Sequence, residues 1–185
     1  MKAIIICGMS SVGKTTVALN VSKKYKLKHF SGGDILKELA INKDESVSGS
    51  DWWDKKHGMR FLSQRIQNTK FDKLVDKKLS QLISKGNVVV TSYPIPWLTT
   101  KGINVWLGGS FKSRAKRLSN RDNISLISAK KILDKRDKNN YRIYKKLYKI
   151  NFGKDLSVFD FVINTDDLNS KQVSDILYCI VKQFQ

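Results

Sequence analysis

Cysteine, histidine and proline are scarce in this chain of 185 residues, which contains two of each. Cys7 and Cys179 lie in apolar runs, so we expect two reduced thiols in the core and not a disulfide-stabilised scaffold. So few cysteines and histidines, at no regular spacing, exclude the common zinc-binding motifs. There are also no repeats and no low-complexity tract that would read as a linker, which indicates one domain over residues 1–185.

Long apolar runs are absent too. No stretch approaches the ~20 consecutive apolar residues that a membrane-spanning helix needs, so we expect no membrane partner. Together with the reduced thiols, this predicts a cytoplasmic protein. Residues 1–7 lead directly into the motif at residues 8–15, and we expect them to belong to the fold and not to a leader.

Acidic side chains are in the minority, with 16 Asp and Glu against 35 Lys and Arg, and the formal net charge is +19. A positive field of this size favours polyanions such as nucleic acids. The charge is spread along the chain, however, and we find no recognisable RNA- or DNA-binding module. We therefore expect most of the basic side chains to face solvent. We also expect a monomer that does not depend on nucleic acid as a partner.

The most informative stretch of the sequence is GMSSVGKT, residues 8–15. It matches the phosphate-binding pattern G-x-x-x-x-G-K-[ST], and it lies between an apolar run and a helical pattern, where such a loop belongs. Its backbone amides and the following helix N-terminus are suited to the phosphates of ATP. Lys14 would contact the transferred phosphoryl group, and the Thr15 hydroxyl would bind Mg²⁺. The expected ATP-binding residues of this segment are Gly8, Met9, Ser10, Ser11, Val12, Gly13, Lys14, Thr15 and Thr16.

Short runs rich in β-branched residues alternate with helical patterns along the chain. Strands are expected at residues 2–7, 27–30, 87–92, 103–107 and 158–164. Helices are expected at residues 14–25, 34–41, 71–85, 110–119 and 170–184. This order predicts an α/β fold of the P-loop NTPase type, a three-layer sandwich in which helices flank a five-stranded parallel sheet. Ligands of such a sheet bind beyond the carboxyl ends of its strands.

Two segments do not fit this alternation, the polar residues 42–70 and the strongly basic residues 122–152. We expect the first to close over an acceptor substrate and the second to be a lid over the triphosphate. The alternative for the basic segment is a helix whose lysines simply face solvent.

Further segments resemble one family. The sequence FSGGDILK, residues 30–37, resembles the S-[TA]-G-[DE]-x-x-R element with which nucleoside monophosphate kinases bind their acceptor. The order and spacing of residues 87–97, 103–107 and 114–121, and the segments 135–137 and 158–165, are similar to those of cytidylate kinases, nearest to the short archaeal-type form. The resemblance covers almost the whole chain. It implies ATP- and Mg²⁺-dependent transfer of a phosphoryl group to CMP or dCMP, giving CDP or dCDP and ADP.

The same resemblance implies roles for individual residues. Lys14, Arg121 and Arg136 would stabilise the transferred charge, and Arg117 would lie over the donor base. Asp34 would help Thr15 to hold Mg²⁺. Ser31 and Lys37 would lie at the acceptor, where Arg136 also clamps the phosphate.

The chain departs from the family after the third expected strand. An acid and an arginine are usual there, but residues 91–93 read Thr-Ser-Tyr. Ser92 and Tyr93 can donate hydrogen bonds to the acceptor but carry no positive charge, so we expect Arg60 or Arg65 to supply it. An acid that accepts from the exocyclic amine is the natural reader of cytosine, and Asp76 on the 71–85 helix is our candidate, with Asp72 beside it.

Several of these residues have plainer readings. Ser31 could simply cap a helix with Asp34, Lys37 and Arg114 could be surface cations, and Asp72 and Asp76 could pair with nearby lysines. Arg121 could form a helix-end ion pair with Asp122. The alternative functions are a kinase of another small acceptor, such as AMP, UMP or a non-nucleotide, and an NTP-hydrolysing factor that binds nucleic acid.

Overall fold

The computed structural model of the protein describes residues 1–41, 53 and 56–184. Residues 42–52 and 54–55, which form much of the expected acceptor-side segment, lie outside the described residues, as does Gln185. Within the described ranges, no helix is long and apolar enough to cross a membrane.

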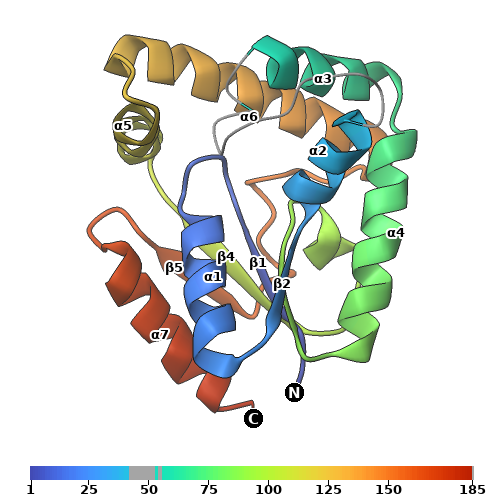
Figure 1. Ribbon diagram of the computed structural model, residues 1–185, viewed down its shortest axis with the longest axis vertical. Helices are drawn as coiled ribbons and strands as arrows, with labels where there is room; N and C mark the ends of the chain where they lie inside the picture. Colours follow the sequence, from blue (N-terminus) through green and yellow to red (C-terminus); the bar gives the residue numbers. More distant parts are fainter. Residues whose placement is uncertain (42–52, 54–55, 185) are drawn as a thin grey trace.

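Five parallel strands form one sheet in the order β2-β3-β1-β4-β5 (Figure 1), which confirms the predicted sheet. β1 is central because it is the most apolar strand and all five of its residues are buried. The strands are β1 Ile4–Gly8, β2 Lys28–Ser31, β3 Val88–Thr91, β4 Ile103–Gly108 and β5 Phe161–Asn164.

The five expected helices are all present, and both segments outside the alternation contain a helix of their own, α3 and α6. α6 is the longest of these helices, with 23 residues, so most of the expected lid is one continuous helix. The helices are α1 Lys14–Tyr25, α2 Gly32–Ile41, α3 Lys56–Gln67, α4 Lys70–Lys85, α5 Phe111–Asp122, α6 Leu126–Tyr148 and α7 Ser170–Lys182.

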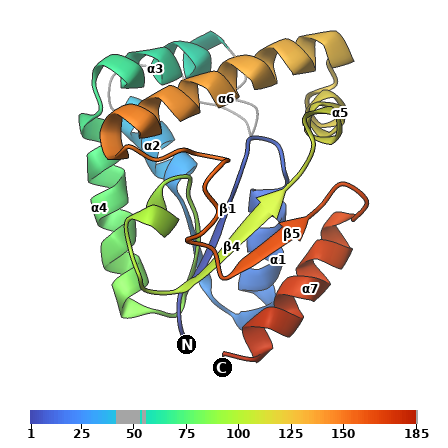
Figure 2. The same ribbon diagram turned by 180° about the vertical axis from the view of Figure 1, so that it is seen from behind.

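Alternate residues of β1 face two different layers. Ile4 and Ile6 pack in a core shared with α1 and α7, whereas Ile5 packs in a core shared with α2 and α4. Figures 1 and 2 show α1 and α7 on one side of the sheet and α4 on the other. This is the predicted three-layer arrangement.

An aromatic cluster covers the second face of the sheet near β4. Trp97 lies 5.2 Å from Phe159 between ring centres, and Trp106 lies 5.6 Å from Phe152. Cys7 is buried in this cluster, and burial raises the pKa of its thiol to about 12. The expectation of a second core thiol is wrong, because Cys179 on α7 is exposed; both cysteines are free.

α3 and α6 lie side by side beyond the carboxyl ends of the strands (Figures 1 and 2). α5 packs against α6 through Ala115, Leu118, Ala129 and Leu133. These helices therefore cover the edge of the sheet at which ligands of parallel α/β folds bind.

Candidate active site

The loop between β1 and α1 has the conformation that an anion-binding loop requires. Gly8 has φ +148°, and a Cβ there would lie 2.4 Å from the Leu107 carbonyl oxygen, so only glycine fits. Gly13 caps α1 with φ 102°, and no side chain caps the helix. The first turn of α1 also has no acidic residue. Its amides and its partial positive charge are therefore left for a phosphate.

Lys14 is folded back onto this loop. Its Nζ donates hydrogen bonds to the carbonyl oxygens of Gly8, at 3.0 Å, and Met9, at 2.7 Å. The loop thus holds the ammonium group beside the backbone amides that are suited to bind an anion.

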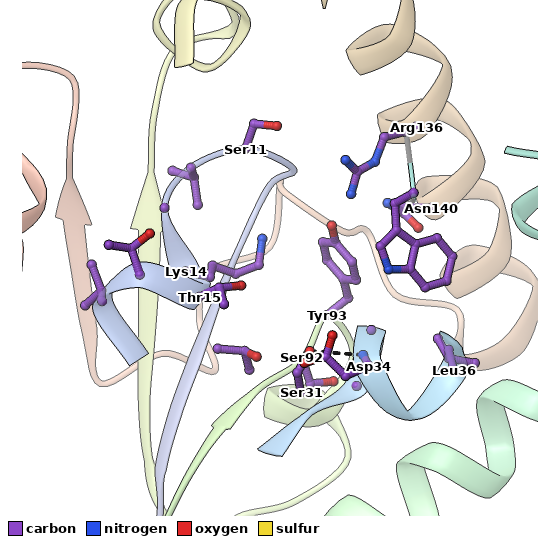
Figure 3. Close-up of a pocket in the computed structure, with 18 of the residues that line it drawn as sticks. Ser11, Lys14, Thr15, Ser31, Asp34, Leu36, Ser92, Tyr93, Arg136 and Asn140 are labelled. Atoms are coloured by element: carbon purple, nitrogen blue, oxygen red, sulfur yellow. Dashed lines mark hydrogen bonds between the residues drawn. The ribbon is translucent and has the colours of Figure 1, made fainter. Parts of the chain in front are cut away.

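A cavity of about 650 Å³ extends from this loop to α4 and α6 (Figure 3). It brings together fifteen of the residues predicted for the site, from both the donor and the acceptor sets. They are Ser11, Val12, Gly13, Lys14, Thr15, Thr16, Ser31, Asp34, Arg65, Asp76, Ser92, Tyr93, Arg117, Arg121 and Arg136.

Five predicted residues do not line the cavity. Gly8, Met9 and Ser10 form the rear of the phosphate loop, and Ser10 is buried. Lys37 on α2 and Arg60 on α3 also lie away from the cavity, although both were expected to supply charge to the acceptor phosphate.

Arg117 connects the phosphate loop to the end of β5. Its guanidinium donates to the hydroxyl of Thr165 at 2.9 Å, to the carbonyl oxygen of the same residue, and to the Val12 carbonyl oxygen at 3.4 Å. Arg121, one turn later on α5, pairs with Asp122 at 2.6 Å. The helix-end ion pair is thus present, and Arg121 still lines the cavity.

Arg114 is not the surface cation that its sequence context suggested. It is 5% exposed and donates to Asp137 of α6 at 2.8 Å and to the Ser10 carbonyl oxygen at 3.1 Å. A buried guanidinium needs such partners. Arg114 therefore fastens the phosphate loop to α5 and α6.

Ser31 and Asp34 lie at the start of α2, and both line the cavity. The Ser31 hydroxyl accepts a hydrogen bond from the Asp34 backbone amide at 3.2 Å, so Ser31 caps the helix while also facing the cavity. The carboxylate of Asp34 lines the cavity that Thr15 also lines. A hydroxyl and a single carboxylate beside a phosphate site suit Mg²⁺, which is usually completed by phosphate oxygens and waters.

Tyr93 lies between residues predicted to bind the donor and residues predicted to bind the acceptor. Its hydroxyl lies 3.1 Å from Ser10 Oγ, and Figure 3 shows the ring between Lys14 and Asn140 with its oxygen toward Arg136. Burial raises the pKa of this phenol, but the positive charges of Lys14 and Arg136 and the hydrogen bond of Ser10 outweigh burial, so the pKa lies below its usual value.

The end of the cavity where the acceptor was expected contains a buried ion pair. Both carboxylate oxygens of Asp72 accept from Arg65, Oδ2 from Nε at 3.2 Å and Oδ1 from Nη2. Arg65 also donates to the Tyr144 hydroxyl at 3.3 Å. Arg65 is 3% exposed, and its guanidinium lies 5.7 Å from the Trp53 ring centre. This arginine, expected to bind the acceptor phosphate, is therefore paired with Asp72 instead of pointing a free charge at the cavity.

Asp76 lies one turn after Asp72 on α4, and its Oδ2 accepts from the Tyr148 hydroxyl at 2.7 Å. The plainer reading, in which these two acids pair with neighbouring lysines, is wrong, because Asp72 is buried against Arg65 of α3 and Asp76 against Tyr148 of α6.

Sequence reasoning missed the contribution of α6 to this end of the cavity. Asn140 and Tyr144 line the cavity with Arg136, and Tyr148 continues the series to Asp76. The spacing of four residues places these side chains along one face of the helix. The four-residue spacing of these side chains is present in the sequence, but the many lysines of the segment favoured its interpretation as a solvent-facing helix.

The comparisons with known proteins show the family to which this chain belongs. The model of the cytidylate kinase-like family matches residues 3–167. A cytidylate kinase of Sulfurisphaera tokodaii is 33% identical over 177 residues, covering 94% of this chain and 92% of that protein. A cytidylate kinase of Methanocaldococcus jannaschii is 29% identical over 94% of both chains.

Solved structures agree on the fold. A shikimate kinase of Bacteroides thetaiotaomicron has a TM-score of 0.62 and is 15% identical, covering 98% of both chains. Another shikimate kinase, from Acinetobacter baumannii in complex with shikimate, has a TM-score of 0.58 and is 16% identical, covering 100% of this chain and 95% of its own. At such identities the likeness concerns the fold alone. With the family match over residues 3–167 and a phosphate loop that opens into a second subsite, this chain belongs to the cytidylate kinase-like family.

Proposed function

We propose that this protein transfers the γ-phosphoryl group of ATP to CMP or dCMP, with Mg²⁺, giving CDP or dCDP and ADP. The observation that carries the proposal is the continuity of the cavity. One space joins the phosphate loop to a pocket lined by Asp72, Asp76 and Tyr144, where a second nucleotide has room beside the first. The archaeal cytidylate kinases that this chain resembles support CMP as the acceptor.

In this reaction an oxygen of the acceptor phosphate forms a bond to the γ-phosphorus while the bond to the β–γ bridging oxygen breaks. The acceptor phosphate is already an anionic nucleophile, so no side chain needs to act as a general base. The work of the protein is to bring two anions together and to stabilise the charge between them. Lys14 lies beside the Tyr93 ring and Arg136 lies near its hydroxyl (Figure 3), and both are suited to that task. Arg121, which also lines the cavity and is partly exposed, would assist them.

Thr15 and Asp34 would hold Mg²⁺, Thr15 through its hydroxyl and Asp34 through coordinated water. When bound, the ion neutralises charge on the β- and γ-phosphates. In the described part of the chain, no three Asp, Glu, His or Cys residues gather into a metal-binding group. The ion would therefore depend on the nucleotide for most of its ligands.

The remaining parts of the proposal concern the environment of the enzyme. We propose a monomer in the cytoplasm, where the exposed thiol of Cys179 would stay reduced. The segment 122–152 would move with α6 as a lid, and no nucleic acid would be needed for activity.

A panel of acceptors tests this function. ADP release with Mg·ATP is measured for CMP, dCMP, UMP, AMP and no acceptor, with and without RNA. We expect CMP and dCMP to be the best acceptors, UMP to be weaker and AMP to be poor. AMP or a non-nucleotide as the best acceptor would replace the proposed substrate. ATP hydrolysis that needs RNA and falls steeply with salt would replace the reaction itself.

A further inference from the structure

Two buried carboxylates stand one helical turn apart at the acceptor end of the cavity. Asp72 is 2% exposed and Asp76 is 7% exposed, and both line the cavity. Burying a carboxylate is costly unless its oxygens find donors, so the partners of each oxygen indicate what the site is built to receive.

The two acids differ in their partners. Both oxygens of Asp72 are occupied by Arg65. Asp76 has one occupied oxygen, Oδ2, which accepts from Tyr148 at 2.7 Å. Within the part of the chain that the structure describes, Oδ1 of Asp76 makes no hydrogen bond. Asp76 therefore offers a single acceptor to a ligand in the cavity.

The groups facing Asp76 come from three helices. Burial raises the pKa of its carboxyl group to about 7, the Tyr148 hydroxyl of α6 opposes that rise, Asp72 of α4 adds to it, and Arg65 of α3 opposes it. The Tyr144 hydroxyl of α6 accepts a hydrogen bond from Arg65. Burial raises the pKa of Tyr144, so its side chain stays a neutral phenol. Asp76 thus titrates in the range in which the enzyme would work.

Resting on the function proposed above, we propose that Oδ1 of Asp76 accepts a hydrogen bond from the exocyclic amino group of cytosine, and that the ionisation of Asp76 sets the preference for CMP over UMP. Cytosine carries an N–H donor at the position where uracil carries a carbonyl oxygen. An ionised Asp76 attracts the first and repels the second. A protonated Asp76 can instead donate its O–H to the uracil carbonyl.

The consequence is a preference that depends on pH. The ratio of kcat/KM for CMP to that for UMP should rise as Asp76 loses its proton, by about tenfold or more between about pH 6 and about pH 8. Dividing the two values of kcat/KM cancels the pH dependence of any group that affects both substrates equally. The 5′-phosphate, Lys14 and the ATP site are common to both substrates, so their ionisation cancels.

Asp76→Asn tests the proposal directly. An amide can turn to present either its oxygen or its N–H, so the variant should lose the pH dependence of the ratio and much of the preference, about 10- to 100-fold at pH 8. Asp134→Asn on α6 is the matched control, because Asp134 is an exposed acid paired with Lys138. The control should reproduce the wild-type ratio at every pH.

Tyr148→Phe provides a second test that keeps the carboxylate. Removing the phenol removes the hydrogen bond that favours the ionised acid, so the rise in the CMP/UMP ratio should move to higher pH. A residue that only supports the fold would lower both values of kcat/KM together and leave the transition where it was. This variant also tests the proposal if Asp76→Asn does not fold.

The possible failures are distinguishable. If the wild type phosphorylates CMP but its CMP/UMP ratio is flat with pH, or is unchanged in Asp76→Asn, then Asp76 does not read the base and the kinase function stands. If the wild type phosphorylates neither pyrimidine nucleotide, the proposed function is wrong and this inference is overturned with it.

Discussion

The amino group of Lys14 lies 4.8 Å from the centre of the Tyr93 ring, and the edge of that ring carries a hydroxyl 3.1 Å from Ser10 of the phosphate loop. A cation over an aromatic face is stabilised by the negative face of the ring. Tyr93 therefore both holds the lysine and presents a donor where phosphoryl transfer would take place.

Tyr93→Phe should keep the ring and lose the donor. Its contacts with Tyr144, at 5.8 Å between ring centres, and Phe152, at 5.3 Å, do not need the hydroxyl, so the melting temperature should hardly change. We expect kcat for CMP to fall about 10- to 100-fold, with smaller changes in KM. Because the pKa of Tyr93 is lowered, wild-type kcat should also fall on the alkaline side as the phenol ionises. A variant with the same alkaline limb as the wild type would show that Tyr93 is not its source.

Lys14→Ala should abolish phosphoryl transfer in a folded protein, since its ammonium group contacts loop carbonyls and the Tyr93 ring but fills no core. We expect kcat/KM to fall by about 10³ or more. Lys23→Ala, an exposed position near the end of the same helix, is the matched control. Near-wild-type turnover by a folded Lys14→Ala protein would overturn the kinase assignment.

Arg136→Ala should lower turnover more than ATP affinity, since Arg136 lies on α6, across the cavity from the phosphate loop. Titration with ATP should give a Kd within a fewfold of the wild type, while kcat for CMP falls about 10²-fold or more. Arg142→Ala, on an exposed position of the same helix, should leave both unchanged. If ATP affinity collapses and turnover of the saturated enzyme survives, Arg136 is a donor-binding residue.

Asp72→Asn should destabilise the fold, because it leaves the buried guanidinium of Arg65 without its carboxylate. Breaking such a pair costs about 3–5 kcal/mol in the free energy of unfolding, which urea denaturation would measure. Asp134→Asn removes an exposed pair on α6 and should cost at most about 0.5 kcal/mol. Equal effects of the two variants would mean that the Arg65–Asp72 pair adds nothing beyond a surface contact.

Asp76 should make the stability of the protein depend on pH. Its carboxyl group has a pKa of about 7 in the folded protein, against a usual value of 3.8. Between these values the unfolded chain releases the proton and the folded chain keeps it, so the unfolding free energy falls as pH rises from about 4 to about 7. The loss is bounded by about 4 kcal/mol. Asp76→Asn should remove this pH dependence. The unfolding free energy of the variant should therefore rise relative to that of the wild type between about pH 4 and about pH 7, and the difference between the two should stay constant at higher pH.

Much of the fold could be predicted because its signals are local. The apolar run at β1, the glycines of the phosphate loop and the alternation of elements each depend on a few neighbouring residues. Strand and helix ends were placed within a few residues. The same local pattern predicted which loop residues, Ser11 to Thr16, line the cavity.

The other end of the cavity was harder to predict, because Arg65, Asp72 and Asp76 meet their partners only through tertiary packing. Arg65 was expected to bind phosphate, but nothing local indicates that its partner is Asp72, seven residues later on another helix. Arg114 looked exposed because its neighbours on α5 are charged, yet packing of α5 against α6 buries it beside Asp137. Burial and pairing of charged side chains depend on distant segments, and periodicity does not report them.

Arg136 and Tyr148 are both on α6, twelve residues apart, which is about 18 Å along an α-helix. In the proposed function, this one continuous helix would set the distance between the end of the cavity that transfers phosphate and the end that binds the base. The helix would fix the distance between the groups that contact the two ends of the acceptor. Changes in the surrounding loops would not alter that distance. Register matters as much as distance, because inserting one residue between Asn140 and Tyr144 would turn the two ends by roughly 100° relative to each other. Each half of the site would remain intact, and the two would no longer face the same nucleotide.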